Sequence, residues 1–582
     1  MQGRTAPSST GLPLVAFVTA LSTLFGCNNL PEENTGAAES GVSAEQPSLD
    51  LDVSGKRTTT PTPSGTSITI GVNASTVLGN ISPEIYGVNF ASSAALADLN
   101  VPLNRSGGNN SSRYNWQLNA DNRGGDWYYE SVPDSSSVPG ERADTFIANA
   151  FNAKAQPMIT IPMVGWVAKL GANREKLSSF SMAKYGLQQG NDAQWYSDAG
   201  NGVLLSGVRI TLNDPNDANV PSDPAYQTAW MQHLTSRWGA ASAGGLRYYI
   251  LDNEPSLWYL SHRDIHPTGA TMDEIRDKLI AYSNAVKDTD PSAQVVGPEE
   301  WGWSALFYSG YDQQQINEGT GVTTDRVAHG GWDYLPWLLD QLRQQSQLSG
   351  RRLLDVFTLH YYPQGGETGT DTSSSMQLLR NRSTRSMWDP NYVEESWIQD
   401  KVQLIPRLRQ MVNTYYPGTR IGITEYNWGA EGHINGATAQ ADLLGIFGRE
   451  GLDLASRWEA PATGTPTYNA FKMYRNYDGL RSTFGDVSLS TTVANPDQVS
   501  AFTARRSSDG ALTVMVIAKV PSTSYQATIN LAGFTPGGAA QVWQLTSTNT
   551  ISRKTDIAVS STGFTATLPA QSITLFVIPR AP

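Results

Sequence analysis

The chain has 582 residues, which is enough for two or three domains with large hydrophobic cores. Its formal net charge of −12 argues against nucleic acid or an anionic membrane surface as the main partner, because both carry negative charge. Cys27 is the single cysteine, so an intramolecular disulfide is excluded.

The segment 1–27 has the pattern of a bacterial export signal. Arg4 precedes the apolar stretch 12–25, which is too short for a comfortable transmembrane helix. Leu24-Phe25-Gly26-Cys27 resembles a lipoprotein box, in which the cysteine is lipidated, although Phe25 is larger than the usual residue there. We expect a lipoprotein-type signal peptide with Cys27 as its lipidation site, and a general secretory signal with an incidental cysteine is the alternative. Either one predicts a secreted or cell-surface protein whose only membrane attachment is an N-terminal lipid anchor.

Two short segments precede the main body of the chain. Residues 28–65 are rich in Ser, Thr, Pro, Gly and acids, so they have little apolar surface to bury and predict a disordered tether. The alternating run around Ile68 and Ile70 and the apolar residues 77–81 indicate β strands. We expect residues 66–84 to pair with the C-terminal β domain.

Residues 85–479 alternate between strand-like and helix-like patterns. The predicted strands are 85–90, 101–105, 157–164, 246–254, 294–299, 355–361, 420–425 and 454–458. The predicted helices between them are 142–154, 225–238, 273–288, 334–347, 398–415 and 438–451. Eight such units predict an α/β fold, a (β/α)8 TIM barrel, with long insertions such as the stretch 200–217 before the fourth strand.

Residues 480–582 change to short alternating runs separated by Gly, Ser, Asn and Pro turns. The predicted strands are 499–505, 512–519, 525–531, 541–545 and 572–578. This spacing predicts an antiparallel β-sandwich. We favour a structural role against the barrel over an independent carbohydrate-binding module.

Two of the predicted barrel strands end on a glutamate. Strand 246–254 is apolar and then stops at Asp252-Asn253-Glu254-Pro255, where the proline prevents further regular pairing. Strand 420–425 ends on Glu425. The carboxyl ends of barrel strands carry the chemistry of such folds, and two glutamates at two strand ends suit glycosidic cleavage. The alternative for the first motif is a simple turn, because these residue types are common in turns.

Five motifs together resemble glycoside hydrolase family 44. They are Asn104-Arg105-Ser106-Gly107-Gly108-Asn109, Asp252-Asn253-Glu254-Pro255, Thr358-Leu359-His360-Tyr361-Tyr362-Pro363, Thr424-Glu425-Tyr426-Asn427-Trp428-Gly429 and Trp458-Glu459-Ala460-Pro461. The resemblance covers about residues 66–582 and implies a secreted, retaining endo-β-1,4-glucanase or xyloglucanase built as a TIM barrel with a β-sandwich. It implies that Glu254 is the acid/base and Glu425 the nucleophile. A β-mannanase or xylanase on the same scaffold, or a surface glycan-binding lipoprotein without catalysis, are the alternatives.

Several further residues are candidates for binding the substrate. They are Asn253, Arg105, His360, Tyr362, Trp428 and Trp458. Asn253 either donates to a sugar hydroxyl or caps its turn, and Arg105 either orients Glu425 or forms a structural ion pair. Tyr362 could hydrogen-bond the nucleophile, and the resemblance implies a sugar-stacking ring at Trp458. Three tryptophans in strand-end loops are candidate outer platforms, namely Trp116, Trp127 and Trp166.

The six histidines are scattered, and no ligating pair is expected on a helix, so we predict no catalytic metal. The acidic loops 192–198 and 214–217 could hold a structural calcium ion or be solvated turns. No Gly-rich phosphate loop follows a strand, which disfavours nucleotide chemistry. We expect a monomer that needs no cofactor and whose partner is a β-glucan polysaccharide.

Overall fold

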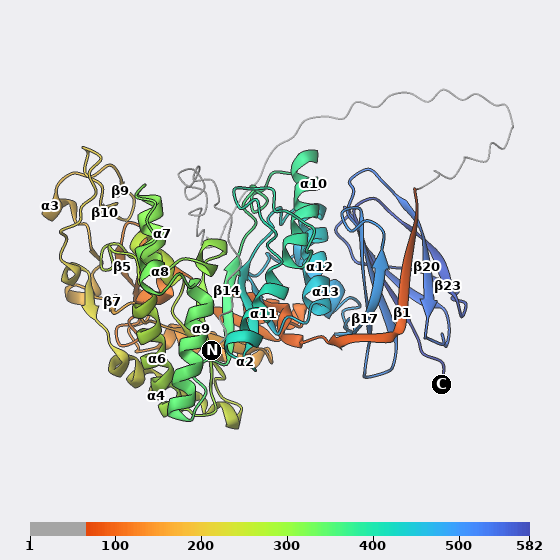
Figure 1. Ribbon diagram of the computed structural model, residues 1–582, viewed down its shortest axis with the longest axis horizontal. Helices are drawn as coiled ribbons and strands as arrows, with labels where there is room; N and C mark the ends of the chain where they lie inside the picture. Colours follow the sequence, from red (N-terminus) through yellow and green to blue (C-terminus); the bar gives the residue numbers. More distant parts are fainter. Residues whose placement is uncertain (1–65) are drawn as a thin grey trace, which may run out of the picture.

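Eight parallel strands form a closed barrel in this computed structural model, which describes residues 66–582 (Figure 1). In chain order they are β2 (Gly87–Asn89), β3 (Leu103–Ser106), β6 (Gln156–Ile161), β12 (Tyr248–Leu251), β13 (Gln294–Glu300), β14 (Val356–Tyr361), β15 (Arg420–Tyr426) and β16 (Leu454–Arg457). Each predicted strand coincides with one of them, and the TIM barrel is confirmed. The candidate lipidation site Cys27, the signal segment and the tether lie outside the described residues.

Helices follow the strands and cover the outside of the barrel, except for the short α3, which lies in the insertion between β6 and β12. Their bounds are α1 (Ser93–Leu99), α2 (Glu141–Asn152), α3 (Met182–Tyr185), α4 (Pro224–Trp238), α5 (Trp258–Ser261), α6 (Met272–Thr289), α7 (Gly310–Asn317), α8 (Thr324–Ala328), α9 (Tyr334–Ser349), α10 (Ser374–Ser383), α11 (Leu404–Tyr415), α12 (Ile434–Arg449) and α13 (Pro466–Arg475). Local sequence sets their starts. Thr271 caps α6 by accepting from the backbone N–H of Glu274, and Pro224 stands in the first turn of α4 behind the capping residue Asp223.

The prediction of one helix over 398–415 is wrong in its first turns. Helix α11 begins only at Leu404, because Gln403 has a left-handed backbone with φ of 44° that cannot continue a right-handed helix. The helix predicted from residue 438 begins earlier, at Ile434, where the side chain of His433 accepts from the backbone N–H of Asn435.

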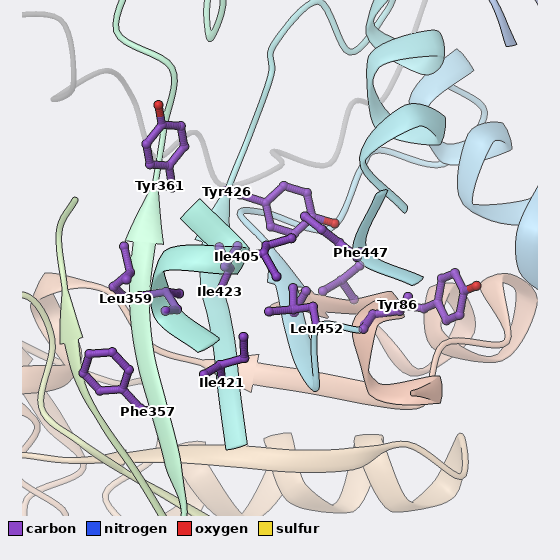
Figure 2. Close-up of a cluster of buried hydrophobic side chains, with 14 of the residues drawn as sticks. Tyr86, Phe357, Leu359, Tyr361, Ile405, Ile421, Ile423, Tyr426, Phe447 and Leu452 are labelled. Carbon is purple, nitrogen blue, oxygen red and sulfur yellow. The ribbon is translucent and has the colours of Figure 1, made fainter. Parts of the chain in front are cut away.

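Side chains of a barrel strand alternate between the barrel interior and the helical layer. On β14, Phe357, Leu359 and Tyr361 point outward into the main hydrophobic core, as Figure 2 shows. Val356 points inward and packs with other interior residues of the barrel. The same alternation turns His360 toward the interior at the carboxyl end of the strand.

The long segments between β3 and β6 and between β6 and β12 form small antiparallel sheets near one end of the molecule (Figure 1). They pair β4 (Ala120–Asn122), β5 (Glu130–Pro133) and β8 (Leu177–Ser178), then β7 (Trp166–Ala168) with β11 (Asn219–Pro221), and β9 (Asn191–Asp192) with β10 (Tyr196–Gly200).

A nine-stranded sheet lies beside the barrel, in the order β22-β21-β24-β19-β18-β17-β1-β20-β23. Its strands are β1 (Thr66–Asn80), β17 (Val487–Val493), β18 (Val499–Arg505), β19 (Leu512–Ala518), β20 (Tyr525–Ala532), β21 (Ala540–Leu545), β22 (Ser552–Ile557), β23 (Gly563–Leu568) and β24 (Ser572–Ile578). The sheet folds over itself, because Phe564 of β23 packs 5.0 Å from Phe576 of β24 although these strands are far apart in the order. The predicted sandwich is therefore confirmed, with one difference: β1 pairs in parallel with β20.

The sandwich and the barrel share a continuous hydrophobic contact. Helix α12 lies so close to β18 that a Cβ on Gly445 would stand 2.1 Å from the ring of Phe502. A buried ion pair joins Lys519 to Asp442 of α12 at 2.5 Å. Within residues 66–582, no helix is both long and apolar enough to cross a lipid bilayer.

Candidate active site

Glu254 follows β12 in a turn with an unusual backbone. Asp252 and Glu254 have left-handed φ angles of 64° and 44°, which are uncommon for residues with a Cβ. The surrounding structure holds the turn in place, since the buried carboxylate of Asp252 accepts hydrogen bonds from Ser112 Oγ and from the backbone N–H of Met163. The turn therefore directs Glu254 to the barrel mouth at a cost in backbone strain, a feature that clusters at functional sites.

Glu425 reaches the mouth because of an irregularity in β15. Ile421 and Ile423 point outward into the main core, so strict alternation would turn Glu425 outward as well. The pairing of β15 with β14 slips between Leu359 and His360, and after the slip Tyr426 occupies the outward position. A β-bulge of this kind re-aims the following side chain, and it leaves Glu425 opposite His360.

The two glutamates and His360 meet at the centre of the mouth. One carboxylate oxygen of each glutamate and one ring nitrogen of His360 all lie within 4.8 Å of one another. His360 Nδ1 lies 2.8 Å from Glu254 Oε1 and 3.6 Å from Glu425 Oε2. The two carboxyl groups are therefore close enough to act on one bond.

Arg105 and Tyr362 hold the two carboxylate oxygens of Glu425. Arg105 Nη1 donates to Glu425 Oε1 at 2.8 Å, and the hydroxyl of Tyr362 donates to Glu425 Oε2 at 2.9 Å. Arg105 is completely buried and also donates to Asn253 Oδ1 at 3.1 Å. Arg105 therefore makes the contact with Glu425 that was one of its two expected roles, whereas His360, a candidate for substrate binding, is buried beneath the carboxylates with no solvent-exposed surface.

Asn253 and Trp458 both lie against Gly108. The backbone N–H of Gly108 donates to Asn253 Oδ1 at 3.2 Å, while Asn253 Nδ2 donates to Asn109 Oδ1. Gly108 has φ of 83°, and a Cβ there would stand 2.7 Å from the ring of Trp458. The half-buried ring of Trp458 also packs edge-on against the exposed ring of Phe90, with centroids 5.6 Å apart. The mouth thus has an aromatic wall, of which Phe90 was not predicted.

The prediction that Trp428 lines the cleft is wrong. Its side chain is 2% exposed, its ring stacks on Tyr361, and its Nε1 donates to Ser383 Oγ. Of the predicted outer platforms, only Trp127 is well exposed, at 44%. Trp116 packs against His233 and Trp166 lies in β7, and both are partly buried against the main core.

Sequence reasoning also missed a third glutamate below the mouth. Glu299 is completely buried, and it bonds to Arg105, His360 and Thr358. The available signal was the pair Glu299-Glu300 at the end of the fifth predicted strand, at the same barrel end as Glu254 and Glu425.

The surroundings of the cluster shift the pKa values of Glu254 and Glu299 in opposite directions. Burial raises the pKa of Glu254 above its ordinary value, the hydrogen bond and charge of His360 oppose the rise, and the charge of Glu425 adds to it. Burial alone would lower the pKa of His360, but the facing carboxylates, Glu425 first, raise it to about 10. Burial alone would raise the pKa of Glu299, but Arg105 and His360 hold it at about 2. The cluster therefore combines a proton-retaining Glu254 with a charged Glu299.

Glu254, His360 and Glu425 also form the one group of acidic or histidine ligands within residues 66–582 that is close enough to surround an ion. The neighbouring Arg105 and the raised pKa of His360 put positive charge there, which repels a divalent cation. The chain does contain histidines four residues apart, His262 and His266, directly after α5, but they contact Arg113 and Glu274 respectively. This arrangement suits proton transfer better than metal binding.

The acidic loops considered for calcium have protein partners. Asp192 accepts from the backbone N–H groups of Gln194 and Trp195, and Asp217 pairs with Lys184 at 2.6 Å.

Comparisons with known proteins identify related glycoside hydrolases. The sequence model of glycoside hydrolase family 44 matches residues 120–365. Endoglucanase A of Paenibacillus lautus is 31% identical over 540 residues, which cover 87% of this chain and 71% of that protein. The crystal structure of CelM2, a bifunctional glucanase-xylanase from a metagenome library, is 66% identical with a TM-score of 0.88, covering 88% of this chain and 99% of CelM2. A Paenibacillus polymyxa xyloglucanase of family 44 is 29% identical with a TM-score of 0.73, covering 88% of this chain and all of that one (100%).

Proposed function

Because the chain belongs to glycoside hydrolase family 44, we propose that it is a retaining endo-β-1,4-glucanase that cleaves xyloglucan and related β-glucans. The observation that carries the mechanism is the approach of Glu254 to Glu425, whose nearest carboxylate oxygens lie within 4.8 Å. Retaining enzymes hold the two carboxyl groups about 5–5.5 Å apart, whereas inverting enzymes need about 6.5–9.5 Å to admit a water molecule. The short separation supports direct attack by a carboxylate on the sugar.

In this mechanism Glu425 attacks the anomeric carbon, and Glu254 gives its proton to the leaving oxygen. Arg105 and Tyr362 each bond one oxygen of Glu425, and together they hold the carboxylate of the nucleophile in one orientation. Burial, which raises the pKa of Glu254, favours the protonated form that an acid requires. After the glycosyl intermediate forms, Glu254 removes a proton from water, which then releases the sugar from Glu425.

We expect the first products to keep the β configuration at their reducing ends. Retention follows from two successive inversions at the anomeric carbon, one by Glu425 and one by water. Proton NMR of xyloglucan digests in the first minutes measures the anomer before mutarotation, with a known inverting glucanase run beside it. Immediate appearance of the α-anomer would exclude the covalent mechanism and both proposed roles.

A second activity on xylan is a candidate because CelM2, a bifunctional glucanase-xylanase, is similar over 99% of its length. The fold and the two carboxylates do not determine the sugar. Initial rates on xyloglucan, carboxymethylcellulose, xylan and mannan, with sizing of the products, separate a glucanase from a xylanase or mannanase. Binding without cleavage on all four would instead identify a glycan-binding protein.

We propose further that the enzyme is exported and that Cys27 carries its lipid anchor. The cysteine directly follows an apolar stretch of signal type. Cys27→Ser is expected to move the protein from the membrane fraction to the soluble fraction with its activity intact, because bacterial lipidation supplies the several chains that stable anchoring needs. Cys27→Ala is the matched control and should behave identically. If fractionation is unchanged in both variants, the segment is a plain secretory signal.

A further inference from the structure

Glu299 occupies a second irregular position of the barrel, next to the bulge that directs Glu425. The pairing of β13 with β14 slips between Pro298 and Glu300, so Glu299 is the extra residue. Its φ of 58° is left-handed. A buried, charged residue held in such a backbone needs strong compensating contacts.

Those contacts converge on both proposed catalytic groups. Glu299 Oε2 lies 2.8 Å from Arg105 Nη2 and 3.2 Å from His360 Nε2. Arg105 Nη1 donates to Glu425 Oε1 at 2.8 Å, and His360 Nδ1 lies 2.8 Å from Glu254 Oε1. One oxygen of Glu299 is therefore linked through one intervening side chain to the nucleophile and through another to the acid/base. Glu299 Oε1 is fixed separately by the hydroxyl of Thr358 at 2.6 Å.

The surrounding carboxylates favour the charged form of His360. Its Nδ1 lies 2.8 Å from Glu254 Oε1 and 3.6 Å from Glu425 Oε2, and its Nε2 lies 3.2 Å from Oε2 of the charged Glu299. With His360 and Arg105 both positive, the negative charges of Glu299 and Glu425 balance them. An additional negative charge on Glu254 is then not needed for neutrality, which favours its protonated form before the reaction.

We propose that Glu299 is a positioning residue, which aligns Arg105 and His360 beneath the two catalytic glutamates and whose negative charge keeps Glu254 protonated. This inference rests on the proposed roles of Glu254 and Glu425. Among its described contacts, Glu299 faces Arg105 from β3, and His360 and Thr358 from β14. The backbone N–H of Glu254 also donates to the backbone carbonyl of Glu299 at 2.9 Å, Glu425 and Tyr362 lie beyond Arg105, and the neighbouring Glu300 contacts Ser256 and Tyr334.

Glu299→Gln tests the charge while keeping the shape. The amide oxygen can accept from Arg105 and His360, and the amide nitrogen can donate to Thr358. Without the negative charge of Glu299, the positive charges of Arg105 and His360 are no longer balanced, and they favour the ionised form of Glu254. The alkaline limb of kcat/KM on xyloglucan, which reports loss of the proton from Glu254, is expected to move to lower pH by about one unit. His360 stays charged in this variant, because Glu254 and Glu425 still face it.

Two further variants separate the effect of the charge of Glu299 from the effect of its side-chain length and orientation. Glu299→Asp keeps the charge but shortens the side chain, so the alkaline limb should lie near its wild-type position while kcat falls several-fold, because Arg105 and His360 lose their alignment. Thr358→Val leaves the charge and frees Glu299 Oε1, so kcat should fall several-fold with KM unchanged and the limb unmoved. The Thr358 variant also decides the alignment role if Glu299→Gln folds poorly, because an unchanged kcat would contradict it.

Asp442→Asn is the matched control for removing a buried, ion-paired carboxylate away from the mouth. It should lower the melting temperature without moving the alkaline limb. The inference is overturned if Glu299→Gln lowers kcat equally at every pH with both limbs of the pH profile unmoved, as the loss of a purely structural residue would.

Glu254→Gln, measured on the same substrate, distinguishes a failure of the proposed catalytic roles from a failure of the role given to Glu299. If it remains fully active the proposed roles are wrong, and if it is inactive while the Glu299→Gln limb is unmoved, only the role of Glu299 is wrong.

Discussion

Glu425→Ala is expected to abolish hydrolysis of every natural glucan, with kcat lower by about 10⁴-fold or more. No other carboxylate replaces the nucleophile, because Glu254 lies on the leaving-group side and Glu299 is buried beneath Arg105. The fold should survive, since Arg105 keeps Glu299 and Asn89 as hydrogen-bond partners. Reducing-sugar release from xyloglucan measures activity, and thermal melting tests the fold.

Added azide gives this variant a diagnostic product. The missing side chain leaves space beside the anomeric carbon, so azide attacks the substrate directly and yields an α-configured glycosyl azide from an activated aryl β-glycoside. Asp556→Ala, which removes an exposed carboxylate on β22 of the sandwich, is the control and should keep activity within about threefold. A β-configured azide, or near-wild-type hydrolysis by Glu425→Ala, would show that Glu425 is not the nucleophile.

Glu254→Ala is expected to lose about 10²–10⁴-fold on xyloglucan, the range typical of general acid catalysis. Natural sugars are poor leaving groups and need the proton that Glu254 supplies. Dinitrophenyl glycosides need no proton, so their first step should remain fast and leave a glycosyl intermediate on Glu425. A burst of dinitrophenol in stopped-flow absorbance followed by slow turnover measures this difference.

Azide should accelerate the slow step of Glu254→Ala, because an anion can attack the intermediate without general-base help. The product here should be the β-configured glycosyl azide, opposite to that of Glu425→Ala. Equal losses on xyloglucan and on the dinitrophenyl substrate, with no response to azide, would contradict the acid/base role. A protein that merely binds glycan would show no turnover in either variant or in the parent chain.

The sequence alone determined the architecture, because hydrophobic periodicity is a local property. Strand 420–425 alternates apolar residues and ends on a glutamate, and strand 246–254 is apolar until the polar turn at Asp252. Such patterns identify strands and their carboxyl ends, and a closed barrel brings those ends together. The positions of Glu254 and Glu425 near one mouth therefore follow from the strand order, and so does the neighbourhood of Arg105, which lies near the end of another strand.

Only the tertiary structure decided which way the side chains point. Strict alternation predicts an outward Glu425, and a bulge against β14 turns it inward. A second bulge places Glu299 under Arg105 and His360, whereas its neighbour Glu300 contacts Tyr334. Bulges depend on how two distant strands pair, so one strand's sequence does not reveal them.

The tertiary structure also decided which of the candidate site residues are buried. Trp428 follows the Glu425 strand and has the composition of a sugar platform, yet it packs on Tyr361 beneath the surface. His360 and Arg105 have the chemistry of substrate ligands, yet they support the two glutamates from below. A residue's type states what it can bind, but the partners that surround it depend on residues more than a hundred positions away in the chain.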